Sequence, residues 1–234
     1  MTDIGVAHIL DSISYEPDLA VLMRRVRVKE GSARAAELLA LVDEARPLAR
    51  PRALYLSSFI SGRGDDFVEI EGLRFESRVL RVNLDKTYRV FPYLATCGQE
   101  LQEWADRQED MVLNYWAEII KEQALRSAIQ AVHEHLVSHY QPGETASMSP
   151  GSLADWPITQ QQVLFQLFGQ HANAIGVCLT DSMLMIPTKS VSGIRFPNHD
   201  SFESCLLCPR EGCPGRRAVF DPELYDQKFC QHAG

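Results

Sequence analysis

The stretch from Gln99 to Tyr140 contains neither proline nor glycine, and it limits the possible folds more than any other part of the chain. Apolar residues recur through it at the spacing of one face of an α-helix. They are Leu101, Trp104, Met111, Trp116, Ile119, Ile120, Ala124, Ala128, Ile129, Val132 and Leu136. The stretch therefore predicts one long helix, or two helices with a bend between them. We expect its apolar face to pack in the core rather than to line a cofactor site.

The other segments predict shorter elements. Ser32 is expected to cap a helix that runs to Ala45. Five segments are predicted as strands: 53–60, 67–70, 87–96, 176–180 and 191–196. Residues 77–84 fit a strand or a short helix, residues 141–157 fit a loop, and Thr159 is expected to cap a short helix. Long helices combined with strands in no regular alternation favour an α+β fold with an antiparallel sheet. No glycine-rich phosphate-binding loop is found in the sequence.

The composition argues against nucleic-acid binding and membrane contact, and it favours a cytoplasmic location. The chain has 234 residues and a net charge of -8, so we expect no nucleic-acid partner. No apolar stretch approaches the roughly 18 residues of a membrane helix, and we expect no membrane contact. The first residues lack the basic and apolar regions of a secretory signal. We therefore expect a cytoplasmic protein, in a reducing compartment where clustered cysteines indicate metal or cluster binding.

Four of the six cysteines lie near the C-terminal end, three of them in the run CLLCPREGC. They are Cys205, Cys208, Cys213 and Cys230. Four thiolates can hold one zinc ion or one iron–sulfur cluster. The spacing resembles a cluster loop more than two paired zinc-binding turns, so we favour a [4Fe-4S] cluster, with Zn2+ as the alternative and unmetallated thiols as the third possibility. Cys97 and Cys178 are expected to be buried small side chains, although either could replace Cys230 as the fourth ligand.

Histidines and arginines add weaker signals. His133, His135 and His139 lie on the predicted long helix, where we expect them to be exposed. The run HLVSH lacks the glutamate of the zinc-hydrolase motif. The pair Arg216–Arg217 follows the cysteine run. These two residues could lie beside an anionic cluster or face an acidic partner, or they could simply form a solvated turn.

Three segments together resemble a known family. They are TCGQELQEW with the helix after it, SPGSLADWP, and LTDSMLMIPTKSVSG. The third segment holds a Leu-Thr-x-Ser run, then Met-x-Pro, then Val-Ser-Gly. Its matching residues are Leu179, Thr180, Ser182, Met185, Pro187, Val191, Ser192 and Gly193. In order and spacing, residues 73–198 resemble the activation (reactivation) domain of vitamin B12-dependent methionine synthase.

The resemblance implies a fold and a function. The implied fold is a bent, C-shaped α+β structure built on a twisted antiparallel sheet with long helices. The implied activity is docking on a corrinoid-binding domain and offering S-adenosylmethionine to reduced cobalamin, which resets cobalt from Co(II). The residues that we expect at the cofactor site are Pro150, Gly151, Thr180, Ser182, Ser192, Gly193 and Arg195. The chain has no corrinoid-binding Asp-x-His-x-x-Gly pattern, so cobalamin is expected to arrive on a partner protein.

The chain also departs from the family pattern. The family's Pro-Gly loop begins with an arginine that binds the methionine carboxylate, whereas residues 147–152 here read SMSPGS. A family tyrosine after the Ser-Gly pair is replaced by Ile194 and Arg195, and a family acidic position on the long helix falls at Gln130. Arg195 could supply the missing charge from another direction. These departures weigh against S-adenosylmethionine binding of the usual kind.

We therefore predict three parts and one favoured function. Residues 1–72 form a segment packed on the core, residues 73–198 form the activation-domain-like core, and residues 199–234 form a cysteine-rich tail. The favoured hypothesis is an enzyme component that docks on a separate corrinoid protein, supports methyl transfer and delivers an electron through the tail. The alternative is a non-catalytic, zinc-stabilised scaffold subunit of a corrinoid methyltransferase complex. An ordinary S-adenosylmethionine methyltransferase is the least favoured, because no glycine-rich strand–loop–helix is found.

Overall fold

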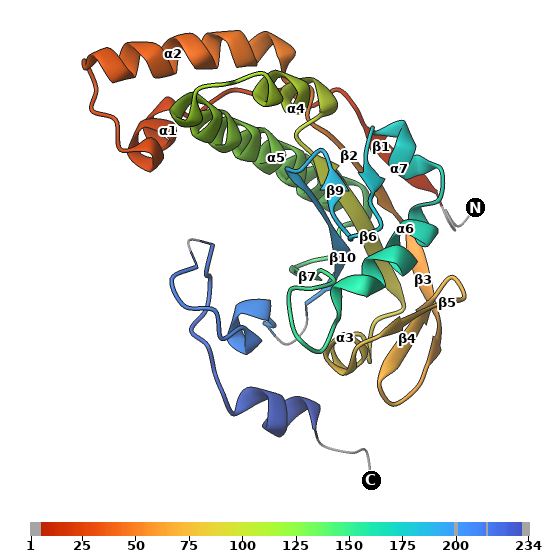
Figure 1. Cartoon of the computed structure of the whole chain (residues 1–234). Coiled ribbons are helices and arrows are strands. Elements are labelled where there is room, and N and C mark those ends of the chain that lie inside the picture. Colours follow the sequence, from red (N-terminus) through yellow and green to blue (C-terminus); the bar gives the residue numbers. More distant parts are fainter. Residues whose placement is uncertain (1–5, 199–200, 214, 231–234) are drawn as a thin grey trace.

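One bent antiparallel sheet organises the molecule. The computed structural model describes residues 6–198, 201–213 and 215–230. The sheet has eight strands in the order β1-β2-β6-β3-β4-β5, with β10 pairing both β6 and β7. They are β1 (Ala7–Leu10), β2 (Arg52–Leu56), β3 (Ser58–Arg63), β4 (Phe67–Ile70), β5 (Leu73–Glu76), β6 (Arg89–Thr96), β7 (Thr145–Met148) and β10 (Ser190–Pro197). A separate hairpin consists of β8 (Cys178–Leu179) and β9 (Met185–Ile186). The chain curves into a C shape around the sheet (Figure 1), which confirms the predicted fold class.

The bend originates at the central strand β6. Residues 93–96 of β6 pair with β2, whereas residues 89–90 pair with β3. The strands β2 and β3 follow each other in the chain with only Ser57 between them. The segment 53–60 was predicted as one strand, but it forms parts of two strands that meet β6 at different points. On its other side β6 pairs with β10, so it is hydrogen-bonded along both edges.

The long proline-free and glycine-free stretch forms two helices, one of the two predicted alternatives. They are α4 (Gln99–Asp106) and α5 (Met111–Tyr140). The second begins at Asp110, whose carboxylate accepts hydrogen bonds from the backbone N–H groups of Val112 and Leu113 at 2.8 and 3.0 Å. Its inner face packs on β2 and β6 through Ala128, Val132 and Leu136, all of them buried. This part of the apolar stripe therefore lies in the core, as predicted.

Two N-terminal helices and α5 form a helical arm. They are α1 (Leu19–Val26) and α2 (Ala33–Ala45), and the short 3-10 helix η1 (Arg46–Leu48) leads on to β2. Ser32 caps α2 as predicted, since its hydroxyl oxygen accepts a hydrogen bond from the backbone N–H of Ala35 at 3.2 Å. An ion pair of 2.8 Å between Arg25 and Glu122 joins α1 to α5.

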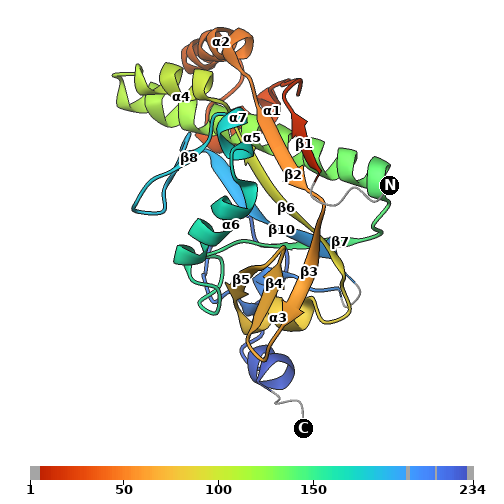
Figure 2. The same cartoon turned by 90° about the vertical axis from the view of Figure 1, so that its right-hand side faces the viewer.

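The other face of the sheet carries shorter helices. They are α3 (Arg78–Asn83), the 3-10 helix η2 (Ile158–Gln160), α6 (Gln161–Phe168) and α7 (His171–Ala174). Figure 2 shows α6 and α7 in front of the sheet and α5 behind it. The sheet therefore separates two packed layers. Apolar residues of β10 such as Ile194 and Phe196 pack in the α6 layer.

Two sequence predictions are wrong in this region. The segment 141–157 was predicted as a loop, but its residues 145–148 form β7, which pairs with β10. Thr159 was predicted as a helix cap, but it lies inside η2 and makes no capping hydrogen bond. The segment 77–84 is resolved as the helix α3, in which the hydroxyl of Ser77 accepts a hydrogen bond from the N–H of Leu80.

The C-terminal tail is folded against the core. It contains the 3-10 helix η3 (Ser204–Leu207) and the π-helix η4 (Tyr225–Phe229). Phe202 and Phe229 are buried, and burying such a ring contributes about 1.5–3 kcal/mol. The Tyr225 hydroxyl donates to the carboxylate of Asp155 at 3.1 Å, and Arg78 Nε donates to the carbonyl of Phe229 at 2.9 Å. The tail is therefore attached by both apolar and polar contacts.

The predicted three-part division stays a prediction. Its first boundary, after residue 72, falls between β4 and β5, which pair with each other. Its second boundary follows Asn198, whose side-chain oxygen accepts a hydrogen bond from the N–H of Phe202 at 2.8 Å. In the described ranges of the chain, no helix is both long and apolar enough to cross a membrane.

Candidate functional site

The pairing of β7 with β10 brings two of the predicted site segments together. Ile194 lies opposite Met148, and Arg195 lies opposite Ser147. A side-chain carbon on Gly193 would lie 2.5 Å from the carbonyl oxygen of Met148 and 2.7 Å from the hydroxyl of Ser149. The Ser-Gly pair and the Pro-Gly loop, 41 residues apart between Gly151 and Ser192, are therefore in close contact.

Replacing Gly193 by alanine is expected to destabilise the protein by about 1–3 kcal/mol, because the new methyl group overpacks the junction between β10 and β7. Urea unfolding would measure the change. Gly215→Ala is the matched control, since a side-chain carbon there meets no atom within 4 Å, and we expect a change within about 0.5 kcal/mol. Equal stability of the two variants would show that the junction is not tightly packed.

The Pro-Gly loop is held in one conformation. Pro150 is buried, and Gly151 adopts a left-handed backbone conformation with φ of 79°. The N–H of Gly151 donates to the carbonyl of Trp156 at 2.7 Å, and the Trp156 ring is buried in the α6 layer. A side-chain carbon on Gly151 would lie 2.8 Å from Ile158 Cδ1. Glycine is required there both by the backbone conformation and by this close approach.

The residues of β10 divide between the two faces of the sheet. Ser192 is buried and accepts a hydrogen bond of 3.4 Å from the side chain of Gln161 on α6. Because side chains alternate along a strand, Gly193 and Arg195 lie on the other face, with Tyr93 of β6. The side chain of Ser192 is therefore used in packing on the α6 side, and Gly193 and Arg195 lie on the opposite face of β10.

Arg195 is a half-buried cation that has no ion-pair partner among the residues described by the structure. Its guanidinium carbon lies 5.3 Å from the centre of the Tyr93 ring. Its Nε is buried and has no hydrogen-bond partner among the residues that the structure describes. Burial lowers the pKa of Arg195 from its ordinary value; Tyr93 opposes this shift, and the charge of Arg217 adds to it.

Thr180 and Ser182 lie apart from this group, on the turn between β8 and β9. Their hydroxyl groups are 3.0 Å apart, and Thr180 Oγ1 also accepts a hydrogen bond of 3.1 Å from the N–H of Leu184. These bonds shape the hairpin turn, which projects from the body of the protein (Figure 2). The structure thus places Gly193 against Met148 and Ser149, which directly precede Pro150 and Gly151. Ser192 faces the α6 side of the same strand, and Thr180 and Ser182 lie on a separate hairpin.

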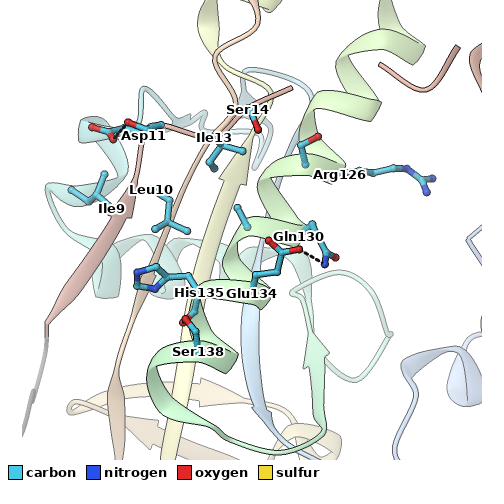
Figure 3. Close-up of a pocket in the computed structure, with 13 residues that line it drawn as sticks. Ile9, Leu10, Asp11, Ile13, Ser14, Arg126, Gln130, Glu134, His135 and Ser138 are labelled. Atoms are coloured by element: carbon cyan, nitrogen blue, oxygen red, sulfur yellow. Dashed lines mark hydrogen bonds between the residues drawn. The ribbon is translucent and has the colours of Figure 1, made fainter. Parts of the chain in front are cut away.

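Gln130 lines a different cavity. A groove of about 1010 Å3 lies between residues 9–14 and α5, and the walls of the groove include no residue of β10. Figure 3 shows Gln130 in this groove, with its side-chain nitrogen donating to Glu134 at 2.9 Å. The family position predicted at Gln130 is therefore not part of the group around Arg195.

A cluster of histidines and tyrosines beside this groove was missed in the sequence. His135 Nδ1 lies 2.8 Å from the Tyr55 hydroxyl, and the Tyr55 ring stacks on His8 of β1 with centroids 4.6 Å apart. His135 and His133 are half-buried, so the prediction of exposed histidines is correct only for His139. Only the pairing of β1 with β2, which places His8 opposite Tyr55, brings these rings together.

The cysteine loop is ordered around one arginine. The guanidinium of Arg216 donates hydrogen bonds to four backbone carbonyls, those of Cys205, Cys208, Arg210 and Ala218. The N–H of Arg217 points to the sulfur of Cys205 at 3.5 Å. Backbone N–H groups directed at sulfur are one means by which a protein stabilises a thiolate or cluster. The loop is therefore held in shape by its own contacts.

The four tail cysteines are suitable ligands for a metal ion or an iron–sulfur cluster. Three of them lie in the cysteine loop, and the fourth lies at the end of η4. Cys205, Cys208 and Cys213 are half-buried in the loop, whereas Cys230 is exposed at the end of η4. Within the described ranges, no group of three or more histidine, cysteine or acidic side chains is arranged to hold a metal ion. Soft thiolate donors suit zinc and iron–sulfur clusters, so the donor chemistry fits both.

The two remaining cysteines differ from each other. Burial raises the pKa of the Cys97 thiol to about 12, so this thiol is uncharged and packed in the core, as predicted. Cys178 was also predicted to be buried, but it is exposed. Its strand β8 pairs only with β9 among the described strands, and this hairpin stands outside the main sheet.

Comparison with known proteins identifies the fold and relates part of the chain to a known family. A crystal structure of the MetH reactivation domain bound to AdoHcy matches with a TM-score of 0.60 and 16% sequence identity, over 86% of this chain and 81% of that chain. No curated protein matches. The chain is thus an α+β protein with the reactivation-domain fold. Residues 101–204 match the family model described as the activation domain of vitamin B12 dependent methionine synthase. The chain is related to that domain, and the resemblance seen in its sequence motifs is confirmed.

Proposed function

We propose that this protein docks on a separate corrinoid protein and keeps that protein's cobalt reduced, with a C-terminal [4Fe-4S] cluster supplying the electron. The family relation supports a corrinoid partner, because an activation domain belongs to a cobalamin-dependent enzyme. The single observation that carries the electron-delivery part is the position of the cysteine loop. This loop is packed beside the junction of β7 and β10, where the predicted cofactor-site residues meet.

Two contacts support this position. The hydroxyl of Ser204 donates to the carbonyl of Ser147 on β7 at 3.3 Å. Arg217 follows the cysteine run and pairs at 2.8 Å with Glu203, the residue before Ser204. We therefore propose that the cysteine loop and the edge of the sheet at β7 and β10 form one surface. A corrinoid presented to that surface would lie next to the electron source.

The chain's own residues would hold and tune the cluster. We assign Cys205, Cys208, Cys213 and Cys230 as its ligands. The guanidinium of Arg216 contacts the carbonyls of Cys205 and Cys208, and its backbone N–H donates to the carbonyl of Cys213 at 3.1 Å, so this residue links the three cysteines of the loop. The N–H of Arg217, which lies 3.5 Å from the sulfur of Cys205, would be one of the groups that tune the cluster. A bound cluster would supply one-electron transfer at this place.

The partner's corrinoid would supply the cobalt chemistry of this function. One electron passed from the tail would take Co(II) to Co(I), and a separate low-potential reductant would provide that electron. The reduced corrinoid would then take a methyl group from a donor, whose leaving group would depart with the electron pair of the broken bond. The role of Thr180 and Ser182 in this proposal is to shape the hairpin that contacts the partner. The reducing cytoplasm is the compartment in which such thiols would stay available for the cluster.

Two other functions are less favoured. Four thiolates also suit Zn2+, and a zinc-stabilised tail would make the chain a scaffold subunit of a methyltransferase complex. S-adenosylmethionine is a candidate methyl donor, because the related solved structure carries AdoHcy. Against this donor, residues 147–152 lack the arginine expected in the family's Pro-Gly loop.

A test of the proposal uses the full chain purified without oxygen. It would be mixed with a Co(II) corrinoid protein and a low-potential reductant, and the visible spectrum would be followed. We expect the Co(II) absorption to disappear faster with the protein than without it, with Co(I) or methyl-Co(III) forming. Unchanged rates across several corrinoid proteins would contradict the proposal. Metal analysis separates the scaffold function, which predicts stoichiometric zinc and no acceleration.

A further inference from the structure

We infer that Asp155 is a positioning residue for the cysteine tail. Its carboxylate holds the helix η4, which leads to Cys230, against the Pro-Gly loop, and this contact sets where the fourth proposed ligand lies. The inference deepens the proposed function, and it rests on that proposal for the assignment of Cys230 as a ligand. The contacts that carry it involve no metal, so they can be tested in the metal-free protein.

The two carboxylate oxygens of Asp155 bind different parts of the molecule. One oxygen accepts a hydrogen bond from the Ser77 hydroxyl and one of 3.0 Å from the backbone N–H of Val79, both at the start of α3. The other oxygen accepts a hydrogen bond of 3.1 Å from the Tyr225 hydroxyl in the tail. The contact with the tail can therefore be removed at Tyr225 while the contacts with α3 remain.

The backbone around Asp155 belongs to the Pro-Gly loop. Leu153 and Trp156 form a β-bridge, in which the N–H of Trp156 donates to the carbonyl of Leu153 at 3.1 Å. The carbonyl of Trp156 accepts a hydrogen bond from the N–H of Gly151 at 2.7 Å, and the Trp156 ring is buried. The tail is thus tied to the same short turn that sets the conformation of Gly151.

Tyr225 connects this carboxylate to Cys230. The backbone carbonyl of Tyr225 accepts a hydrogen bond from the N–H of Cys230 at 3.1 Å, within the turn of the π-helix η4. Such turns are rare, and they occur frequently at functional sites. Burial and the neighbouring Asp155 raise the pKa of Tyr225 to about 12, so its hydroxyl keeps the proton that it donates. Hydrogen bonds therefore run from Asp155 through Tyr225 to the backbone of Cys230.

Apolar packing between the tail and the core is incomplete at this point. A cavity of about 300 Å3 is lined by the tail residues Leu207 and Tyr225 and by the core residues Val79, Leu153, Ala154 and Asp155. Leu207 directly precedes Cys208, so both cysteine-bearing parts of the tail border this cavity. Atoms that face a void lose dispersion contacts on that side. The hydrogen bond between Asp155 and Tyr225 therefore has a large share in holding the tail here.

The first test is hydrogen exchange on the metal-free full chain. Tyr225→Phe removes the hydroxyl that reaches Asp155 and keeps the ring. We expect the amides of residues 225–230 to exchange about tenfold faster than in the parent protein, while those of α5 stay unchanged. Tyr88→Phe, which removes the hydroxyl of a tyrosine that is 75% exposed, is the matched control and should exchange as the parent does. Equal exchange of residues 225–230 in the parent protein and Tyr225→Phe would overturn the inference.

A second test separates the positioning of a ligand from the attachment of the tail. Iron release to a chelator would be followed in the full chain prepared without oxygen, or zinc release if the chain holds zinc. We expect both Tyr225→Phe and Asp155→Ala to release the metal about tenfold faster than the parent protein. The double variant should be no faster than Asp155→Ala, because both changes remove the same hydrogen bond. Unchanged metal release, or effects that multiply in the double variant, would overturn the positioning role.

The two proposals can fail separately. A chain that binds no metal contradicts the proposed function and the ligand role of Cys230, and the hydrogen-exchange result then decides by itself whether Asp155 holds the tail. If the chain accelerates cobalt reduction while Tyr225→Phe changes neither exchange nor metal release, the proposed function stands and the inference about Asp155 is wrong.

Discussion

Replacing Cys208 by serine is expected to remove the bound iron and to abolish the acceleration of Co(II) loss. A serine hydroxyl is a poor substitute for a thiolate ligand, and Cys208 lies in the part of the loop that Arg216 holds in place. We expect the reduction rate to fall about tenfold or more, towards the rate with reductant alone. Iron and acid-labile sulfide assays on the anaerobic protein, together with the visible spectrum of the corrinoid, would measure both effects.

Cys178→Ser is the matched control for this prediction. Cys178 is exposed on the β8–β9 hairpin, and in the present assignment it is not a ligand. The variant should keep its iron and its activity. If Cys178→Ser loses iron while Cys230→Ser keeps it, the fourth ligand has been assigned wrongly. If Cys208→Ser itself keeps a full complement of iron, the cysteine loop is not the cluster site.

Replacing Lys121 by methionine is expected to destabilise the protein by about 1–3 kcal/mol, the cost of leaving hydrogen-bond acceptors without their buried donor. Lys121 is buried, and its ammonium group donates to Glu118 at 2.6 Å, Gln102 at 2.9 Å and Thr188 at 3.1 Å. Methionine fills a similar volume but leaves these acceptors without their donor. Because Gln102 also accepts a hydrogen bond from the N–H of Thr188, the loss should loosen the start of β10. Urea unfolding would measure the free energy.

Lys189→Met provides the control for this second prediction. Lys189 pairs with the same Glu118, at 3.3 Å, but its side chain is partly exposed. Exposed ion pairs contribute little, so we expect a loss of about 0–1 kcal/mol. If the two variants lose the same stability, the buried position of Lys121 is not what makes it important.

Local patterns in the sequence predicted α2, α4, α5 and α6, whereas α1 and α7 were not predicted and α3 was left open between a strand and a helix. Ser32 caps α2, and the stretch without proline or glycine forms α4 and α5, because capping and helical periodicity depend on residues that are near each other in the chain. The strand β7 could not be predicted in the same way. Its residues Thr145–Met148 show no strong alternation and lie in a segment rich in glycine, proline and serine. They form a strand because β10, more than 40 residues later, supplies the hydrogen-bonding partner.

The candidate site was predicted in part. The motif around Ser192 and Gly193 and the Pro-Gly loop were recognised from sequence, and the structure brings them into contact. The exchange of a family tyrosine for Ile194 and Arg195 was also visible. That Arg195 has no partner among the described residues depends on burial and on the position of the tail, which no local pattern encodes. The same holds for Thr180, whose hydroxyl bonds within its own hairpin.

The metal content of the anaerobically purified full chain tests the central claim most directly. The account predicts about four iron atoms and four acid-labile sulfides in each chain, with the thiols of the tail protected from alkylation in the folded state. Stoichiometric zinc without sulfide would contradict electron delivery and favour the scaffold function. A colourless, metal-free protein with freely alkylated Cys205, Cys208, Cys213 and Cys230 would contradict both.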